Sequence, residues 1–144
     1  MKHKVYIMIG PSGSGKSTWI ADNMPLNAAV CSADSFFIDE QGSCRFDASK
    51  LHSAHTACQR AYGKRLYQGW PVVVVDNTNL VNKERKFYVK MAQKLNYEIH
   101  YIAFKCDDAE LLINRNTKGT PQHIIERHIR RMSIPEGAEI VEVS

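Results

Sequence analysis

A short stretch near the start of the sequence has the residue types and the spacing needed to hold a polyphosphate. Residues 10–17 read GPSGSGKS and match the pattern GxxxxGK[ST] at every fixed position. Glycines let the backbone curl so that its N–H groups converge on phosphate oxygens, while the lysine adds a positive charge. We therefore predict that this stretch and the residue after it bind the phosphates of a nucleotide. The predicted contacts are Gly10, Pro11, Ser12, Gly13, Ser14, Gly15, Lys16, Ser17 and Thr18.

Two residues of this loop have more specific expected roles. Lys16 is expected to bridge the β- and γ-phosphates of ATP, and the Ser17 hydroxyl is expected to ligate Mg²⁺. GTPases share this loop but also need a guanine-binding NKxD motif, which the sequence lacks. Nothing in the sequence resembles the second nucleotide motif of ABC or RecA-type ATPases, for which the chain is also short. We therefore predict a compact phosphotransferase that uses ATP and Mg²⁺.

Two aspartates follow apolar runs and are candidates for catalysis and for metal binding. Asp34 lies in the stretch SADSFF, where a substrate would bind beside the phosphate loop. We predict that Asp34 orients the acceptor hydroxyl and takes its proton as general base; the alternative is that it caps a helix or turn. Asp76 ends the run VVVVD and has the position of a carboxylate that holds Mg²⁺, directly or through water. Its alternative is to cap a turn together with Asn77, and the two roles are compatible.

A basic stretch late in the chain predicts a lid. Residues 115–121, RNTKGTP, lie between two predicted helices and are expected to form a mobile segment over the site. Arg115 is the candidate that would stabilise the charge on the transferred phosphoryl group. Arg130 and Arg131 are interpreted as a solvated helix face. None of the histidines is predicted to be functional.

Strands and helices must position these residues. The alternation of apolar runs with amphipathic stretches predicts an α/β fold around a mostly parallel sheet. Runs such as VVVV at 72–75 do not alternate with polar residues, as expected of strands covered on both faces. The expected strands are 5–9, 28–31, 72–75 and 99–104, with a fifth at 140–143. One expected helix follows the phosphate loop, and the others cover 48–68 and 82–95 or begin at Asp107 and at Thr120-Pro121.

Several of these helices carry recognisable ends and faces. Asp47 is the expected cap of helix 48–68, and Gly69 is its expected end. Asp107, with Glu110 three residues later, matches a capping box, and Thr120 before Pro121 matches a cap followed by a first-turn proline. The expected buried face of helix 48–68 consists of Leu51, Ala54, Cys58, Ala61, Tyr62 and Leu66.

Composition and length limit the class of protein. A chain of 144 residues with 44% hydrophobic and 24% charged residues predicts a single globular domain over 1–144. The net charge of +4 is compatible with a polyanionic partner, although nucleotide phosphates alone would explain it. No apolar run is long enough to cross a bilayer, and the four cysteines lack metal-ligand spacing. We expect reduced, mostly packed thiols in a cytoplasmic protein without a membrane partner; no protein partner can be inferred.

Taken together, these motifs resemble the polynucleotide-kinase-like branch of P-loop kinases over nearly the whole chain. The motifs that carry the resemblance are residues 10–18 (GPSGSGKST), 32–37 (SADSFF), 74–80 (VVDNTNL) and 115–121 (RNTKGTP). The branch includes kinase domains of phage and bacterial polynucleotide kinases and of a ubiquitin-ligase-binding protein of animals. The resemblance implies a three-layer fold with four to five strands, helices on both faces and a small lid. It also implies a base at Asp34, phosphate and metal ligation by Lys16 and Ser17, and a lid arginine at Arg115.

Similar proteins transfer the γ-phosphoryl group of ATP to the 5′-hydroxyl of DNA or RNA, so the implied partner is a single-stranded nucleic acid end. In the phage enzyme an arginine follows the base by three residues and holds the acceptor's phosphate, whereas that position here is Phe37. Two alternatives remain open: a kinase of a nucleoside or another small alcohol, and an ATP-binding module without transfer activity. The nearby phenylalanines are interpreted as core, with stacking on an acceptor base as the alternative: Phe36, Phe37 and Phe46.

Overall fold

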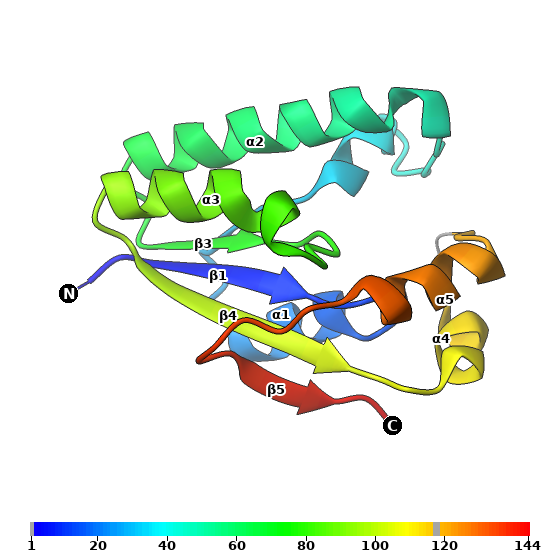
Figure 1. Cartoon of the computed structure of the whole chain (residues 1–144). Coiled ribbons are helices and arrows are strands. Elements are labelled where there is room, and N and C mark those ends of the chain that lie inside the picture. The colour runs from blue at the N-terminus through cyan, green and yellow to red at the C-terminus, as the bar shows by residue number, and fades with distance from the viewer. Residues whose placement is uncertain (1, 117–118) are drawn as a thin grey trace.

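The computed structural model of the chain describes residues 2–116 and 119–144. In that part of the chain, five parallel strands form one sheet in the order β2-β3-β1-β4-β5 (Figure 1). The strands are β1 (Lys4–Ile9), β2 (Ala29–Cys31), β3 (Val72–Val75), β4 (Glu98–Lys105) and β5 (Glu139–Glu142). The predicted α/β fold is confirmed, and each predicted strand agrees with the observed one to within one residue at either end.

Helices connect these strands. The α-helices are α1 (Lys16–Asn23), α2 (Leu51–Tyr67), α3 (Asn82–Lys94), α4 (Ala109–Arg115) and α5 (Gln122–Arg131), and two short 3₁₀ helices are η1 (Ala33–Phe37) and η2 (Ala48–Lys50). The predicted helix 48–68 is therefore divided into η2 and α2. Asp47 caps η2, since its carboxylate accepts the Ser49 N–H, and Gly69 with φ 78° follows the end of α2.

Three details of the predicted helices are wrong. The cap of α4 is Asp108, whose carboxylate accepts the N–H groups of Glu110 and Leu111, and not Asp107. The cap of α5 is Pro121 and not Thr120, so the proline lies one position before the helix rather than in its first turn. Leu51 and Ala61 are exposed instead of buried, because the buried face of α2 runs through Ala54, Cys58, Tyr62, Gly63 and Leu66.

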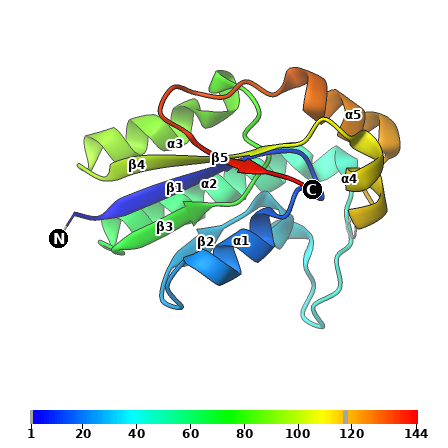
Figure 2. The ribbon, with the colours of Figure 1, turned by 90° about the horizontal axis from the view of Figure 1, so that it is seen from below.

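The sheet is the middle of three layers. Helices α2 and α3 lie over one face, and α1 lies against the other (Figures 1 and 2). Successive residues of a strand point to opposite faces, so in β1 the side chains of Val5 and Ile7 pack toward α2 and α3 while Met8 packs toward α1. Helices α4 and α5 pack on each other beyond the carboxyl ends of the strands, around Leu112 and Ile125.

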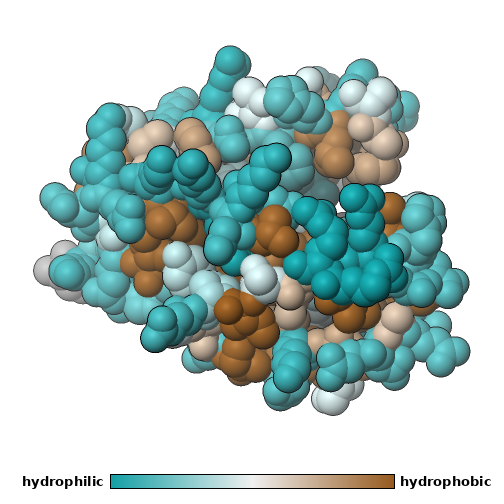
Figure 3. Space-filling model, in the orientation of Figure 1, coloured by the Kyte–Doolittle hydropathy of each residue, from teal (hydrophilic) through white to brown (hydrophobic). Residues whose placement is uncertain are grey.

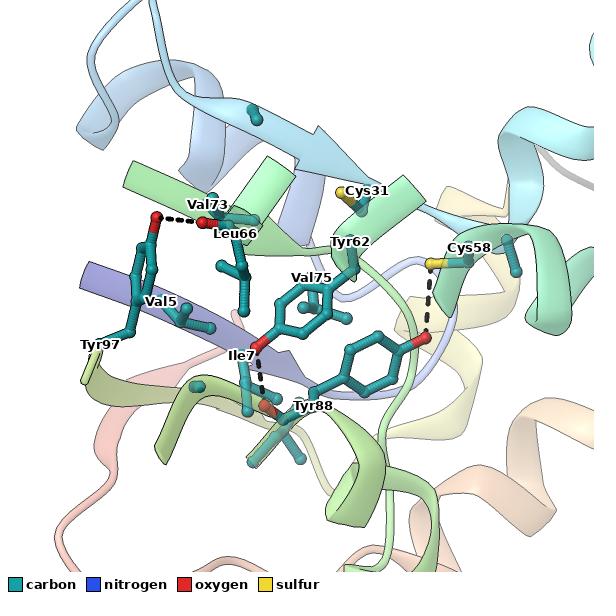
Figure 4. Close-up of a cluster of buried hydrophobic side chains, with 14 of the residues drawn as sticks. Val5, Ile7, Cys31, Cys58, Tyr62, Leu66, Val73, Val75, Tyr88 and Tyr97 are labelled. Atoms are coloured by element: carbon teal, nitrogen blue, oxygen red, sulfur yellow. Dashed lines mark hydrogen bonds between the residues drawn. The ribbon is translucent and has the colours of Figure 1, made fainter. Parts of the chain in front are cut away.

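The core between the sheet and α2 and α3 contains buried polar atoms that are paired with one another (Figure 4). The Tyr62 hydroxyl donates to the Tyr88 carbonyl oxygen at 2.7 Å, and the Tyr88 hydroxyl donates to Cys58 Sγ at 3.4 Å. Burial raises the pKa of both tyrosine hydroxyls and, together with the nearby Cys58, raises the pKa of the Cys31 thiol to about 12. The Cys31 thiol is therefore a protonated packing group, and all four cysteines are free, as the sequence predicts.

The surface is mainly hydrophilic on the face seen in Figure 3, where hydrophobic side chains occur in small separate groups. Within the described residues, no helix has the length and apolar character needed to cross a membrane.

Candidate active site

The phosphate loop lies between β1 and α1, and its shape depends on two glycines with left-handed backbone torsions. Gly13 has φ 81° and Gly15 has φ 99°, a region that other residues rarely adopt. A Cβ at Gly13 would also lie 2.8 Å from the Leu112 carbonyl oxygen of α4. Glycine is therefore needed at this position both for the torsion and for the close contact between the loop and α4.

The side chain of Lys16 is buried against the loop that precedes it. Its Nζ donates to the carbonyl oxygens of Gly10 at 2.9 Å and Pro11 at 2.8 Å. Lys16 is also the first residue of α1, where the N-terminal end of the helix carries a partial positive charge. An ammonium group and a helix N-terminus thus occur together in one loop, an arrangement suited to an anionic phosphate.

Ser17 and Asp76 meet although they are far apart in the sequence. The Ser17 hydroxyl donates to Asp76 Oδ2 at 3.1 Å, and Asp76 is buried at the end of β3. The second oxygen of Asp76, Oδ1, is buried and accepts no hydrogen bond from any residue that the structure describes. A buried carboxylate oxygen without a partner is unfavourable, and a cation would compensate for it.

These two side chains fit a Mg²⁺ site. Mg²⁺ prefers oxygen ligands and usually takes only one or two from the protein, with water and substrate phosphates as the rest. The residues described contain no group of three or more His, Cys, Asp or Glu side chains that could hold a metal by themselves. The roles of Ser17 and Asp76 as ligands remain predictions.

Asp34 lies in η1, directly after β2. The cap of this short helix is Ser32, whose hydroxyl accepts the Asp34 N–H at 3.1 Å. The Ala33 N–H donates to Asn77 Oδ1 at 2.8 Å, so the loop after β2 is tied to the loop after β3. Because β2 and β3 are neighbours in the sheet, the segment carrying Asp34 is held next to the one carrying Asp76.

The loop after β3 is also tied to the phosphate loop. Asn79 adopts a left-handed torsion with φ 46° and donates from Nδ2 to the Met8 carbonyl oxygen at 2.8 Å. The Gly10 N–H donates to the Thr78 carbonyl oxygen at 3.0 Å. The loop that carries Asp76 is therefore held against the phosphate loop by both contacts.

Arg115 lies near the phosphate loop, in the lining of the same cavity. As the last residue of α4 it is exposed, and its guanidinium donates to the Ser144 carbonyl oxygen. It lines a cavity of about 630 Å³, a size that admits a nucleoside. The other lining residues are Gly13, Ser14, Gly15, Lys16, Ser17, Thr18, Trp19, Asp22, Asn23, Phe104, Asn116 and residues 141–144. The catalytic role of Arg115 stays a prediction, and residues 117–118 of the predicted lid lie outside the described residues.

His128 is a site residue that the sequence analysis missed. The Ser12 N–H of the phosphate loop donates to its Nδ1 at 3.4 Å. Burial, followed by the charge of Lys16, lowers the pKa of His128 to about 4. The helical spacing from Ile125 indicates only that His128 lies near the buried face of α5, so the sequence offers no signal for this contact.

Arg85 was also missed. It is 2% exposed and donates four hydrogen bonds, to the Asn79 and Ser133 carbonyl oxygens, Asn82 Oδ1 and Ser133 Oγ. It therefore joins the loop after β3 to the segment that follows α5. A signal existed in the sequence, because Arg85 precedes Tyr88 and Ala92 at helical spacing on the buried face of α3.

Comparison with known proteins identifies the family. A family profile described as an AAA domain matches residues 5–133, and this span includes the phosphate loop and the loops after β2 and β3. The chain belongs to this AAA domain family. The prediction of a P-loop kinase family is thereby confirmed, and the fold is that of its kinase neighbours.

This AAA domain is similar in sequence to a segment of one human protein and similar in fold to two solved structures. A segment of NEDD4-binding protein 2 of Homo sapiens is 28% identical over 156 residues, which covers 95% of the chain and 9% of that protein. A chain of the Pnkp1/Rnl/Hen1 RNA repair complex has a TM-score of 0.69 at 19% identity, covering 90% of this chain and 44% of that one. A gluconokinase from Sinorhizobium meliloti has a TM-score of 0.60 at 18% identity, covering 98% of this chain and 83% of that one.

These likenesses establish the fold of the AAA domain. The chain spans about a tenth of the human relative and less than half of the RNA repair chain. One structural neighbour is part of an RNA repair complex and another is a gluconokinase, so the fold serves proteins with different functions.

Proposed function

We propose that this AAA domain transfers the γ-phosphoryl group of Mg²⁺-ATP to the 5′-hydroxyl of DNA or RNA. The observation that supports the proposal is the hydrogen bond of 2.8 Å between Ala33 N and Asn77 Oδ1. It ties the segment of the candidate base, Asp34, to the loop that carries Asp76, the candidate metal ligand. A donor site and an acceptor site would then share one edge of the sheet, as phosphoryl transfer requires.

Each residue has a distinct part in the proposed reaction. Asp34 would orient the acceptor hydroxyl and take its proton while the oxygen forms a bond to the γ-phosphorus and the bond to the β–γ bridging oxygen breaks, releasing ADP. Lys16 would exchange its carbonyl partners for phosphate oxygens, and Arg115 would stabilise charge on the transferred group. Mg²⁺, held by Ser17 and Asp76, would neutralise charge on the β- and γ-phosphates when bound.

A second candidate for the acceptor, a nucleoside or another small alcohol, has support of its own. Phe37, which occupies the position of the phage enzyme's phosphate-binding arginine, is 6% exposed and contacts Phe36 and Phe46 with ring centroids 5.3 and 5.2 Å apart. Phe36 and Phe46 are themselves exposed. An apolar surface near Asp34 favours a nucleoside or another small alcohol, whose recognition needs no cation for a phosphate.

The deciding experiment measures transfer of labelled γ-phosphate from Mg²⁺-ATP to a short oligonucleotide with a 5′-hydroxyl. We expect the wild type to label the oligonucleotide, Lys16→Ala to be inactive, and Asp34→Asn to bind ATP but lose most turnover. Turnover that falls with rising salt supports a polynucleotide acceptor. Folded wild type that binds ATP and labels neither DNA nor RNA would overturn the polynucleotide proposal and favour the small alcohol.

Unchanged turnover in Lys16→Ala would refute the assigned donor site. A collapse of ATP affinity in Asp34→Asn would show that Asp34 has a metal-binding or structural role instead of acting as the base.

A further inference from the structure

The imidazole of His128 on helix α5 contacts the phosphate loop. The Ser12 N–H lies 3.4 Å from Nδ1. A backbone N–H can only donate a hydrogen bond, so the Nδ1 that accepts it carries no proton. The contact therefore requires a neutral imidazole with its proton on Nε2, and an imidazolium could not make it.

Burial, together with the balance of the surrounding charges, keeps His128 in that neutral form. Lys16 at the start of α1 and Arg127 and Arg131 on α5 lower its pKa, whereas Glu84 in the first turn of α3 raises it. Burial is the largest cause, and the resulting pKa is about 4. At neutral pH the side chain is available as a hydrogen-bond acceptor.

The helix that carries His128 is fixed on both sides of the contact. Before it, Ile125 is fully buried with Leu112 of α4, whose carbonyl oxygen lies against Gly13 of the loop. After it, the Ser133 N–H donates to the Leu80 carbonyl oxygen at 2.8 Å. Helices α4 and α5 thus contact consecutive residues of the phosphate loop, Gly13 and Ser12.

We propose that His128 is a positioning residue of the phosphate loop, which holds the Ser12 amide so that the turn at residues 11–14 keeps its nucleotide-binding shape. The inference rests on the proposed function, since it assumes that the loop binds Mg²⁺-ATP. His128 acts through Ser12 and needs no contact with the substrate. Its effect is therefore on the affinity for the nucleotide.

Two substitutions separate this role from simple packing. His128→Leu replaces the imidazole by an apolar side chain of similar size that has no acceptor, and His128→Asn places Oδ1 close to the position of Nδ1. We expect His128→Leu to raise the Kd for Mg²⁺-ATP about three- to tenfold, the loss of one hydrogen bond, and His128→Asn to recover most of that loss. His123→Leu, an exposed histidine on the same helix, is the matched control and should leave the Kd unchanged.

The test combines calorimetric titration of the four proteins with NMR of the wild-type imidazole nitrogens without nucleotide. The spectrum should show an unprotonated Nδ1 at pH 7 and a titration midpoint well below 6.5, together with a Ser12 amide resonance that moves in His128→Leu. Equal or better binding by His128→Leu than by His128→Asn, or an Nδ1–H tautomer, would overturn the inference. Failure of the wild type to bind Mg²⁺-ATP would instead refute the proposed function, while the NMR measurement still decides the state of His128.

Discussion

Replacing Arg85 should destabilise the protein more than any exposed substitution on α3. Arg85 is 2% exposed, and its four hydrogen bonds join the loop after β3 to Ser133 beyond α5. Burial lowers its pKa, but a guanidinium stays charged at any accessible pH. The side chain therefore brings a buried charge whose partners are carbonyl, amide and hydroxyl oxygens.

The expected loss of free energy of unfolding follows from the oxygen acceptors that lose Arg85 as their donor. Arg85→Met fills the space but leaves acceptors unpaired, and we expect it to lower the free energy of unfolding by about 3–5 kcal/mol. Arg85→Lys keeps the charge, yet a single ammonium cannot serve two carbonyls through Nη1 and two side chains through Nη2, so about 1.5–3 kcal/mol should be lost. Either loss is a large part of a typical total of about 5–15 kcal/mol.

The assay is urea unfolding followed by far-UV circular dichroism, with Lys86→Met as the matched control. Lys86 is the exposed neighbour of Arg85, and its substitution should change the free energy by no more than about 0.5 kcal/mol. The reasoning fails if Arg85→Met is as stable as Lys86→Met, or if Arg85→Lys is less stable than Arg85→Met. One cooperative transition in the wild type would also support the prediction of a single domain.

Three further predictions concern the site. Gly13→Ala should weaken Mg²⁺-ATP binding at least about tenfold in calorimetry, because the new Cβ would lie 2.8 Å from Leu112 O at φ 81°; wild-type affinity would contradict the steric argument. Asn77→Ala should lower kcat about tenfold with little change in the KM for ATP, because Ala33 N loses its partner, and a change in KM alone would assign Asn77 to the donor site. Acidification from pH 7 to 5 should lower the free energy of unfolding by about 1 kcal/mol through His128, because the unfolded imidazole binds a proton near pH 6.5 and the folded one only near pH 4. His128→Leu should remove this contribution. If the free energy of unfolding of His128→Leu depends on pH as that of the wild type does, the contribution of His128 is refuted.

The strands and the places of the candidate residues in the fold could be predicted because short stretches of sequence determine them. A strand covered on both faces is apolar throughout, so β3 is visible as the run 72–75, and polar residues at its end fall at the edge of the sheet. The glycine loop is equally explicit, since Gly13 and Gly15 meet torsional demands that other residues rarely satisfy.

What could not be predicted depends on contacts between distant segments. Ser12 and His128 are 116 positions apart, and nothing in either neighbourhood indicates that the two meet. The capping pattern in the sequence also cannot choose between Asp107 and Asp108 as the cap of α4, because the two are identical neighbours and only the path of the chain decides between them.

Helical periodicity gave most of the buried face of α2 correctly but was wrong for Leu51 and Ala61. Leu51 is 41% exposed because the helix begins there, at the edge of the covered surface. Arg85 shows the opposite case, in which a charged residue occupies the buried face because polar groups from three segments converge on it.

The central position of β1 has a consequence for the order in which the chain folds during synthesis. Its two neighbours in the sheet are β3, which begins at Val72, and β4, which ends at Lys105. The phosphate loop at the end of β1 is thus translated before β3 and β4, the two strands that flank β1. Until then β1 is an apolar strand without neighbouring strands, a condition that slows folding and favours chaperone binding. We therefore expect nucleotide to stabilise only late intermediates of this domain, because β1 has both of its neighbouring strands only after β4 has been translated.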